Sequence, residues 1–338
     1  MRFLDLRSGK TFMKKWAKIV ICVLVLAMLI PLFAYDNKIL PAILELAETA
    51  GIIPTEHIHS PQEFFEPEMY WELFPEDLEL TARQAFVYDC QTETFTYLMG
   101  RPDDIVYPAS ITKLFTAYVV LQHLDPEQTI QADEVLELVS ADSSVAGVQT
   151  GNVLTVEMLV EGMLLPSGND AAYILAAEVG RTIVDDPDLE SYVAITRFVD
   201  EMNRQARMLG MTGTNFSNPD GYHFTTHYTT YEDMALIGKL ALENETIRKY
   251  ANVAKENVIF ASGEKQTWEN TNALLNPESE YYCQYAIGLK TGYTSAAGSC
   301  LLSAFQYEGR QWIIGVFGCP EHKDRFADTL LIFNSLIQ

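Results

Sequence analysis

The chain reads Tyr-Pro-Ala-Ser-Ile-Thr-Lys at residues 107–113, and apolar residues follow at helical spacing as far as Leu121. No Gly or Pro interrupts this pattern before Asp125-Pro126, so it predicts a helix that has Ser110 at its N-terminus. Residues three apart lie on one face of a helix, and the amine of Lys113 can therefore reach the hydroxyl of Ser110. Backbone N–H groups at a helix N-terminus favour developing negative charge. If burial lowers the pKa of Lys113, its neutral amine can accept the proton of Ser110.

Two more polar clusters follow in the chain, Ser167-Gly168-Asn169 and Lys290-Thr291-Gly292. A strand that carries Lys and Thr beside a nucleophile offers charge and a hydroxyl to a carboxylate. Gly in such a strand leaves room for a substrate backbone. The order SxxK, SxN, KTG is the signature of serine acyl-transferases, which include penicillin-binding proteins and class A β-lactamases.

The sequence around these clusters resembles the low-molecular-weight D-alanyl-D-alanine carboxypeptidases, peptidase family S11, from about Ala85 to the C-terminus. The stretches that carry the resemblance are Tyr107–Ser110, Leu164–Ala172, Asn218–Gly221, His227–Thr230, Asn270–Asn272, Gly288–Gly292 and Ala297-Gly298. The resemblance implies an α+β fold of the DD-peptidase/β-lactamase type. We therefore expect an antiparallel sheet flanked by helices, with a helical subdomain.

The resemblance also implies roles for the first two clusters. Ser110 is expected to be the acylated nucleophile and Lys113 its general base. Ser167 is expected to relay the proton, and Asn169 to bind the substrate amide. Taken singly, each has a simpler explanation: Ser110 as a helix cap, Lys113 as a surface lysine, Ser167 as a cap and Asn169 as a turn residue. The three ordered clusters together favour catalysis.

The remaining expected site residues bind the substrate from the third cluster onward. Lys290 and Thr291 correspond to the family's partners of the terminal carboxylate. The backbone N–H groups of Ser110 and Tyr293 would form the oxyanion hole. Arg325 aligns without a gap with a family arginine that meets the same carboxylate, although a cation at a helix start is the simpler explanation of this residue alone.

The expected activity is removal of the terminal D-alanine from peptidoglycan stem peptides, with β-lactams as covalent inhibitors. One alternative is a class A-like β-lactamase, which needs a carboxylate to activate the deacylating water. The nearest candidate, Glu201-Met202-Asn203, belongs to an amphipathic helical pattern. Another alternative is a penicillin-sensing domain without turnover, but only about eighteen residues precede the apolar segment at 19–34, too few for a signalling domain.

The N-terminal part of the chain predicts export. Residues 1–18 are basic, and residues 19–34 are uncharged and apolar, as in a signal anchor or a signal peptide. Residues 35–84 are expected to form an extracytoplasmic stalk and residues 85–338 the catalytic domain. We therefore expect a bacterial membrane protein with its catalytic domain outside the cytoplasm, or a secreted protein if the segment is cleaved.

The acidic composition excludes one class of partner. The net charge is −23, and residues 1–34 hold six basic residues and one acidic residue, so the exported body carries about −28. A nucleic-acid partner is not expected for such a body. His223 and His227 are four apart, but no third ligand accompanies them, so we expect a structural role for both and neither a metal nor a cofactor.

Two local expectations concern strands. Glu308-Gly309 predicts a two-residue hairpin turn, which would set Cys300 opposite Phe317 and diagonal to Cys319. A disulfide is within reach there, although buried free thiols are favoured. The first strand carries Glu93 where the family usually turns on Gly, so that turn must differ. Since the chain ends at Gln338, we also expect it to lack the β-rich C-terminal domain of many relatives.

Overall fold

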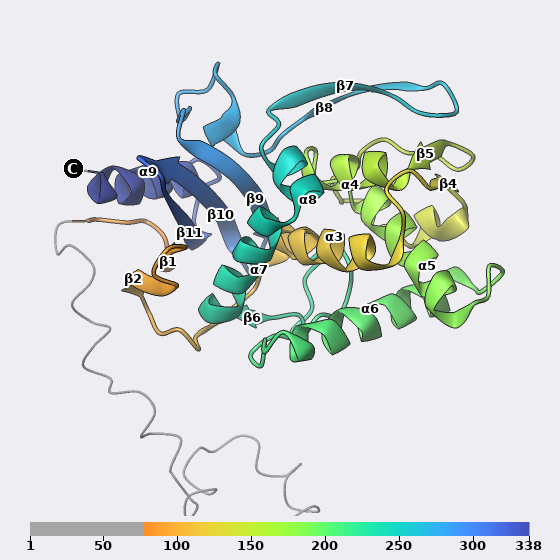
Figure 1. Ribbon diagram of the computed structural model, residues 1–338, viewed down its shortest axis with the longest axis horizontal. Coiled ribbons are helices and arrows are strands. Elements are labelled where there is room, and N and C mark those ends of the chain that lie inside the picture. The colour runs from red at the N-terminus through yellow and green to blue at the C-terminus, as the bar shows by residue number, and fades with distance from the viewer. Residues whose placement is uncertain (1–77, 338) are drawn as a thin grey trace, which may run out of the picture. The chain divides into compact units, whose positions relative to one another are not determined.

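A computed structural model describes residues 78–337 (Figure 1). Its central element is a five-stranded antiparallel sheet with the strand order β2-β1-β11-β10-β9. The strands are β1 (Gln84–Asp89), β2 (Thr94–Met99), β9 (Ala286–Thr294), β10 (Gly298–Tyr307) and β11 (Arg310–Cys319). β1, the first described strand, thus pairs with β11, the last, so the two ends of the catalytic body lie side by side in the sheet.

Helices cover both faces of this sheet. They are α3 (Thr112–His123), α4 (Val156–Leu164), α5 (Asn169–Val184), α6 (Ser191–Met208), α7 (Tyr231–Glu243), α8 (Glu245–Ala251) and α9 (Asp324–Leu336). In Figure 1, α9 lies beyond the sheet on one side, whereas α7, α8 and the helices around α3 lie on the other. The predicted α+β fold, with its antiparallel sheet and helical subdomain, is confirmed.

The alternation of side-chain direction along the strands explains why the hydrophobic core has two layers. Successive side chains of a strand point to opposite faces of a sheet. Phe86 and Leu302 accordingly belong to the large apolar cluster that surrounds α3. Val87 and Leu301 belong to a second cluster under α9, where the ring of Phe333 stacks on that of Phe305 at 4.2 Å. β10 is buried on both faces from Ser299 to Phe305, and its apolar residues accordingly occupy both alternating sets of positions.

Short elements join the large ones. They are the strands β3 (Ile105–Val106), β4 (Thr129–Gln131), β5 (Val153–Thr155), β6 (Thr229–Thr230), β7 (Lys255–Ile259) and β8 (Lys265–Glu269), and the 3-10 helices η3 (Ala109–Ile111), η4 (Glu134–Leu138) and η5 (Ala273–Leu275). Three two-stranded ribbons result, β3 with β6, β4 with β5, and β7 with β8. The β7–β8 ribbon projects beyond α4 and α8 in Figure 1.

The predicted hairpin turn is confirmed, but its consequence for the cysteines is not. Tyr307 pairs with Arg310 across the turn, and Glu308 and Gly309 both have positive φ angles, 48° and 81°. The register shifts between Ser299 and Leu301, so Cys300 lies in a bulge rather than opposite Phe317. Cys300 and Cys319 are buried free thiols.

The amphipathic pattern around Met202 forms a helix, and side-chain hydrogen bonds fix the start of α7. α6 spans the predicted amphipathic segment, and Thr230 caps α7 by accepting a hydrogen bond from the backbone N–H of Asp233. The Asp233 carboxylate does not complete a capping box. It accepts hydrogen bonds from the Gly213 backbone N–H and the Thr214 hydroxyl instead, which ties α7 to the preceding loop.

Glu93 lies in the turn between β1 and β2. Glu93 itself takes the left-handed conformation, with φ of 56°. Its carboxylate forms an ion pair with Lys239 on α7. The contact attaches the β1–β2 turn to the helical layer.

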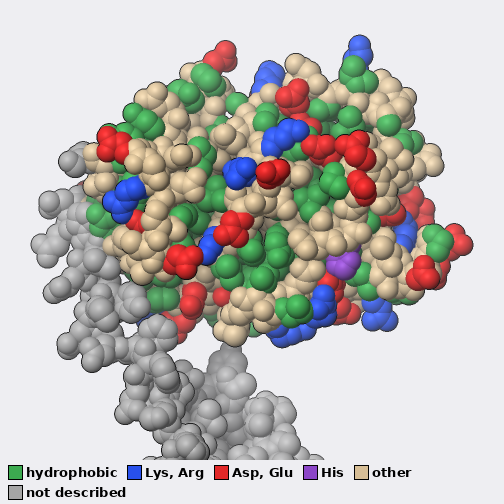
Figure 2. Space-filling model, viewed as in Figure 1, with side chains coloured by type: hydrophobic (Ala, Val, Ile, Leu, Met, Phe, Trp, Pro, Cys, Tyr) green, Lys and Arg blue, Asp and Glu red, His purple; other side chains and the backbone are tan. Residues whose placement is uncertain are grey.

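The segment before β1 lies against the catalytic body. The backbone N–H groups of Thr81 and Ala82 donate to the carboxylate of Asp328 on α9, and the Arg83 N–H donates to the Phe317 carbonyl. Residues 19–34 fall outside the described residues, and so does most of the expected stalk. Across residues 78–337, no helix has the length and apolar character needed to cross a membrane. Figure 2 shows basic side chains beside acidic ones over the visible face.

Candidate active site

Ser110 and Lys113 form the centre of the site. Ser110 lies in η3, which leads directly into α3, so the α-helix begins two residues later than the sequence pattern predicts. The two side chains still meet, because Lys113 Nζ donates a hydrogen bond of 2.8 Å to Ser110 Oγ. A second hydrogen bond of 2.8 Å runs from Nζ to the carbonyl oxygen of Asp220. The hydroxyl and the amine are therefore held in contact from the outset.

Burial changes the acid–base behaviour of Lys113. Its side chain is fully buried at the start of α3. Loss of solvation disfavours the charged form and lowers the pKa of Lys113 to about 8, although the carboxylates of Asp220 and Asp170 oppose this shift. The neutral amine is thus available near physiological pH, as a general base requires.

Two glycines hold the 3-10 helix that carries Ser110. A methyl group on Gly292 of β9 would lie 2.8 Å from the Pro108 carbonyl oxygen and 3.2 Å from the Ser110 nitrogen. A methyl group on Gly221 would lie 1.8 Å from the Ala109 carbonyl oxygen, and Gly221 has φ of +85°. Gly292 therefore allows β9 to pack directly against η3, a packing role that the sequence pattern did not reveal.

The second motif lies between α4 and α5. Ser167 has a positive φ of 64° and does not cap the helix, because Gly168 occupies the N-cap position of α5. Asn169 is the first residue of α5. Its side-chain amide donates to the Ser143 hydroxyl at 2.9 Å and to Asp220 Oδ2 at 2.5 Å. Those bonds fix the orientation of the Asn169 amide.

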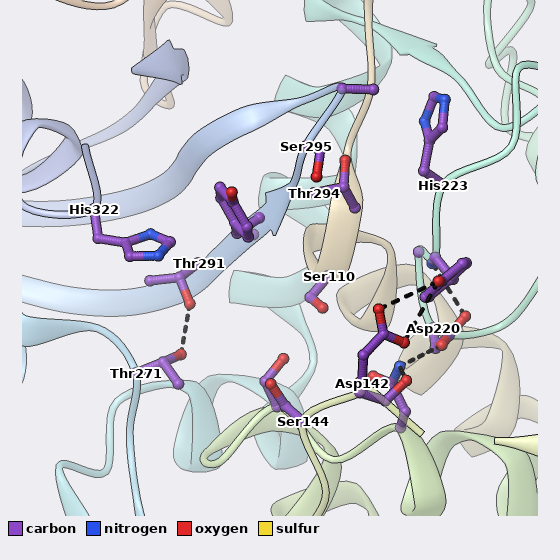
Figure 3. A pocket seen from close by; sticks show the side chains of 18 of the residues that line it. Ser110, Asp142, Ser144, Asp220, His223, Thr271, Thr291, Thr294, Ser295 and His322 are labelled. Carbon is purple, nitrogen blue, oxygen red and sulfur yellow. Dashed lines mark hydrogen bonds between the residues drawn. The ribbon is translucent and has the colours of Figure 1, made fainter. Parts of the chain in front are cut away.

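These elements enclose a cleft of about 780 Å³ (Figure 3). Six of the eight residues expected from the sequence line it: Ser110, Ser167, Asn169, Thr291, Tyr293 and Arg325. Lys113 and Lys290 lie behind the cleft wall. The three sequence clusters, separated by up to 180 residues of chain, therefore converge on one site.

Lys290 is more deeply placed than a lysine on an open strand edge would be. It is fully buried, and its Nζ donates to the Thr291 carbonyl at 3.2 Å and contacts the Thr271 hydroxyl at 3.5 Å. Burial, with the charges of Lys113 and Arg325, holds the pKa of Lys290 well below its usual range. Thr291 reaches the cleft itself, and its hydroxyl lies 2.5 Å from that of Thr271 (Figure 3).

Arg325 supplies a cation that lines the cleft. It lies in the first turn of α9, only 8 % exposed, and one terminal nitrogen donates to the Gly292 carbonyl at 3.2 Å. Burial lowers the pKa of Arg325 to about 10. Its buried Nε finds no hydrogen-bond partner within the described part of the chain. The guanidinium is therefore positioned to bind an anion beside β9.

Several residues of the site were not singled out from the sequence. Asp220 is buried, and this burial raises its pKa against the opposing effect of Lys113. His322 lines the cleft beside Tyr293, with ring centroids 4.6 Å apart, and its Nδ1 lies 3.0 Å from the Ser299 hydroxyl. Thr271 contacts the third motif from the loop after β8. Asp220 and Thr271 belong to stretches that carry the family resemblance, although no role was assigned to either, and His322 belongs to none of these stretches. Tertiary folding brings all three to the cleft.

His227 has a role in supporting α3. Its Nδ1 accepts a hydrogen bond from the Ser217 backbone N–H, so its Nε2–H donates to the Thr112 hydroxyl at 2.8 Å. Burial lowers the pKa of His227 to about 3, and it stays neutral. Within residues 78–337, no group of three His, Cys, Asp or Glu side chains is arranged to hold a metal ion.

Comparison with known proteins agrees with this geometry. The family model described as "D-alanyl-D-alanine carboxypeptidase" matches residues 72–321, about three quarters of the chain. The chain belongs to this family. The match extends over all three motifs and the whole sheet. It favours the carboxypeptidase family over the β-lactamase and penicillin-sensing alternatives.

Individual family members show the same relationship. The chain is 30% identical over 257 residues to the D-alanyl-D-alanine carboxypeptidase DacF of Bacillus subtilis (strain 168), covering 75% of this chain and 61% of DacF. It is 32% identical over 234 residues to the D-alanyl-D-alanine carboxypeptidase of Streptomyces sp. (strain K15), covering 67% of this chain and 77% of that protein. The chain thus spans about three fifths of DacF and about three quarters of the Streptomyces protein.

Solved structures of the family superpose on the fold. The Streptomyces K15 DD-transpeptidase matches with a TM-score of 0.68 at 29% identity, over 76% of this chain and 97% of that one. Penicillin-binding protein D2 from Listeria monocytogenes, solved in its ampicillin-bound form, matches with a TM-score of 0.62 at 27% identity, over 78% of this chain and all of that one.

Proposed function

We propose that this protein is a serine-type D-Ala-D-Ala carboxypeptidase that removes the terminal D-alanine of peptidoglycan stem peptides. The main support is the pair formed by Ser110 and Lys113, whose polar atoms lie 2.8 Å apart, with Ser110 lining a cleft that Arg325 also lines. A nucleophile in contact with a base of suitable pKa, with a cation nearby for a carboxylate, matches the chemistry of this reaction.

Acylation begins at Ser110. Its Oγ attacks the carbonyl carbon of the penultimate D-alanine, and its proton passes to the neutral amine of Lys113. The carbonyl oxygen becomes an oxyanion, which the backbone N–H groups of Ser110 and Tyr293 stabilise. Loss of one such donor typically costs about 10²- to 10³-fold in rate. The peptide C–N bond then breaks, and the leaving D-alanine takes its proton from Lys113 through Ser167.

Deacylation returns the enzyme to its starting state. A water molecule gives a proton to Lys113, and its oxygen attacks the ester carbonyl. The Ser110 ester bond breaks, Ser110 regains a proton, and the shortened peptide leaves as a carboxylate. A β-lactam carbonyl is attacked in the same way, but its leaving amine remains attached to the acyl group, which accounts for covalent inhibition.

Specificity for a chain end follows from the cationic side of the cleft. Arg325 and the hydroxyl of Thr291 bind the terminal carboxylate. Lys290 lies behind the strand, where the negative charge of a bound carboxylate would favour its protonated form against the burial that lowers its pKa. The bonds from Asn169 to Asp220 and Ser143 leave the amide oxygen of Asn169 oriented for the substrate backbone. This division leaves the catalytic pair on η3 and α3 and the carboxylate-binding groups on β9 and α9.

The location of the enzyme follows from the N-terminal sequence. We propose that residues 19–34 direct export and attach the protein to the membrane, with the catalytic body outside the cytoplasm. The support is the basic stretch that precedes this uncharged apolar run. An extracytoplasmic position gives the cleft access to peptidoglycan.

The experiment is a peptidase assay with the full-length protein. Nα,Nε-diacetyl-L-Lys-D-Ala-D-Ala is supplied, and the released D-alanine is measured. We expect turnover by the wild type, and none above background for Ser110→Ala or Lys113→Ala. Labelled penicillin should modify the wild type but not Ser110→Ala. Turnover that survives in both variants would disprove the mechanism, and a wild type that releases no D-alanine would disprove the function.

A further inference from the structure

The two sides of the cleft differ in charge. Figure 3 places Thr291 and His322 on one side of Ser110, and Asp142 and Asp220 on the other. The cation that lines the cleft, Arg325, is bound to Gly292 of β9 and so belongs to the side of Thr291. A substrate that fits this cleft carries negative charge at one end and gains from positive charge at the other.

The Asp142 carboxylate is free to bind a ligand. Asp142 is exposed, and its contact in the structure is the Tyr222 hydroxyl, 3.4 Å from both carboxylate oxygens. No Lys or Arg of the described part of the chain forms an ion pair with it. A carboxylate accepts about four hydrogen bonds, so most of its capacity remains available.

The other carboxylate of the cleft is already engaged. Asp220 is buried and accepts hydrogen bonds from the Asn169 amide and the Tyr222 backbone N–H. Its charge faces Lys113, whose pKa it influences. Asp142 is therefore the carboxylate that can interact with a charged group of the substrate.

Asp142 lies on a segment that is held firmly in place. The Asp170 carboxylate accepts hydrogen bonds from three successive backbone N–H groups, those of Ala146, Gly147 and Val148. The Asn169 N–H donates to the Ser144 carbonyl at 2.8 Å. These bonds attach the segment to the start of α5, which carries the second motif. Asp142 thus lies two residues before a backbone position, Ser144, that is bonded to the second motif.

The direction of the bound peptide decides which side chain meets Asp142. This step rests on the proposed function, in which Arg325 and Thr291 bind the terminal carboxylate and Ser110 attacks the penultimate residue. In that pose the residue before the penultimate one lies beyond Ser110 from Arg325, on the side of the cleft where Figure 3 places Asp142. One extended residue advances about 3.3–3.6 Å, and a long side chain adds to this reach.

We propose that Asp142 is a specificity-determining residue that binds the protonated side-chain amine of a diamino acid placed immediately before D-Ala-D-Ala. Asp142 makes no contact with the reacting atoms and takes no part in bond making. Asp142 therefore affects which stem peptides the enzyme selects as substrates. Tyr222 contributes a hydroxyl that orients the carboxylate.

The test compares two peptides that differ in one charge, Nα-acetyl-L-Lys-D-Ala-D-Ala and its Nα,Nε-diacetyl form, with the full-length protein at pH 7. We expect the wild type to have a kcat/KM about 3- to 10-fold higher for the peptide with the free amine. This preference should shrink in 0.5 M NaCl, because salt screens an exposed ion pair.

Variants separate the role of Asp142 from general effects. Asp142→Asn should lower the preference to about 1 while turnover of the diacetyl peptide stays at the wild-type level, which also shows that the variant is folded. Asp142→Lys should prefer Nα-acetyl-Nε-succinyl-L-Lys-D-Ala-D-Ala, whose side chain is anionic. Glu137→Gln removes another exposed carboxylate, one that does not line the cleft, and should keep the wild-type preference.

The possible outcomes distinguish an error in the inference about Asp142 from an error in the proposed function. If the wild type hydrolyses both peptides with equal efficiency, or if Asp142→Asn keeps the wild-type preference, the inference about Asp142 is wrong and the carboxypeptidase function stands. If the wild type hydrolyses neither peptide, the proposed function is wrong and the inference falls with it.

Discussion

The side-chain amide of Asn169 donates a hydrogen bond of 2.5 Å to the carboxylate of Asp220. The bond joins the second motif to the loop that accepts a hydrogen bond from Lys113. Asp220 therefore influences both the orientation of a substrate-binding amide and the protonation of the base. A change at this one buried carboxylate should be visible in the pH dependence of the reaction.

The pH profile of acylation should follow Lys113. Only the neutral amine accepts the Ser110 proton, and the pKa of Lys113 is about 8. The rate of labelling by penicillin should therefore rise about tenfold per pH unit below pH 8 and level off above it. Stopped-flow labelling between pH 5.5 and 9.5 measures this. A rate that is constant across that range would show that Lys113 is not the base.

Replacement Asp220→Asn should move this profile to lower pH. The negative charge of Asp220 raises the pKa of Lys113, so its removal favours the neutral amine. We expect the midpoint to fall by up to about one pH unit. The maximal rate should fall as well, because the new side chain no longer orients Asn169 in the same way. Asp188→Asn, at an exposed turn away from the cleft, is the control.

Arg325→Ala should impair recognition of a free carboxylate. A hydrogen bond to a charged group contributes about 1.5–3 kcal/mol, so kcat/KM for a D-Ala-D-Ala peptide should fall about 10- to 100-fold. A peptide with an amidated C-terminus lacks the charge and should lose much less. Assay of both peptides gives the comparison, with Arg207→Ala on the exposed surface of α6 as the control. Equal losses for both peptides would contradict carboxylate binding by Arg325.

Gly221→Ala should destabilise the fold around the nucleophile. The added methyl would lie 1.8 Å from the Ala109 carbonyl oxygen, and the backbone has φ of +85°. We expect a loss of more than about 3 kcal/mol in the free energy of unfolding, together with loss of penicillin labelling. Gly210→Ala has a similar φ of +84° but open space around it, so it isolates the backbone cost, about 1 kcal/mol. Denaturant unfolding measures both, and equal effects would show that the contact with Ala109 is unimportant.

Local sequence determined those contacts and turns that form between residues close together in the chain. The spacing of Ser110 and Lys113 sets their contact, because η3 and α3 place residues three apart on one side. The turn at Glu308-Gly309 likewise depends on a few adjacent residues, and the structure confirms it. Membership of the family followed from short motifs in a fixed order.

Only the tertiary structure decided how those motifs meet and which other residues join them. The burial of Lys290, the bulge at Cys300 and the positions of Asp220 and Asp142 depend on contacts between segments far apart in the chain. Burial sets the pKa of Lys113, and burial is a property of packing rather than of sequence spacing. The sequence by itself determined which reactive groups are available to the site. Packing of the helices against the sheet decided which of these groups are protonated and how they are oriented.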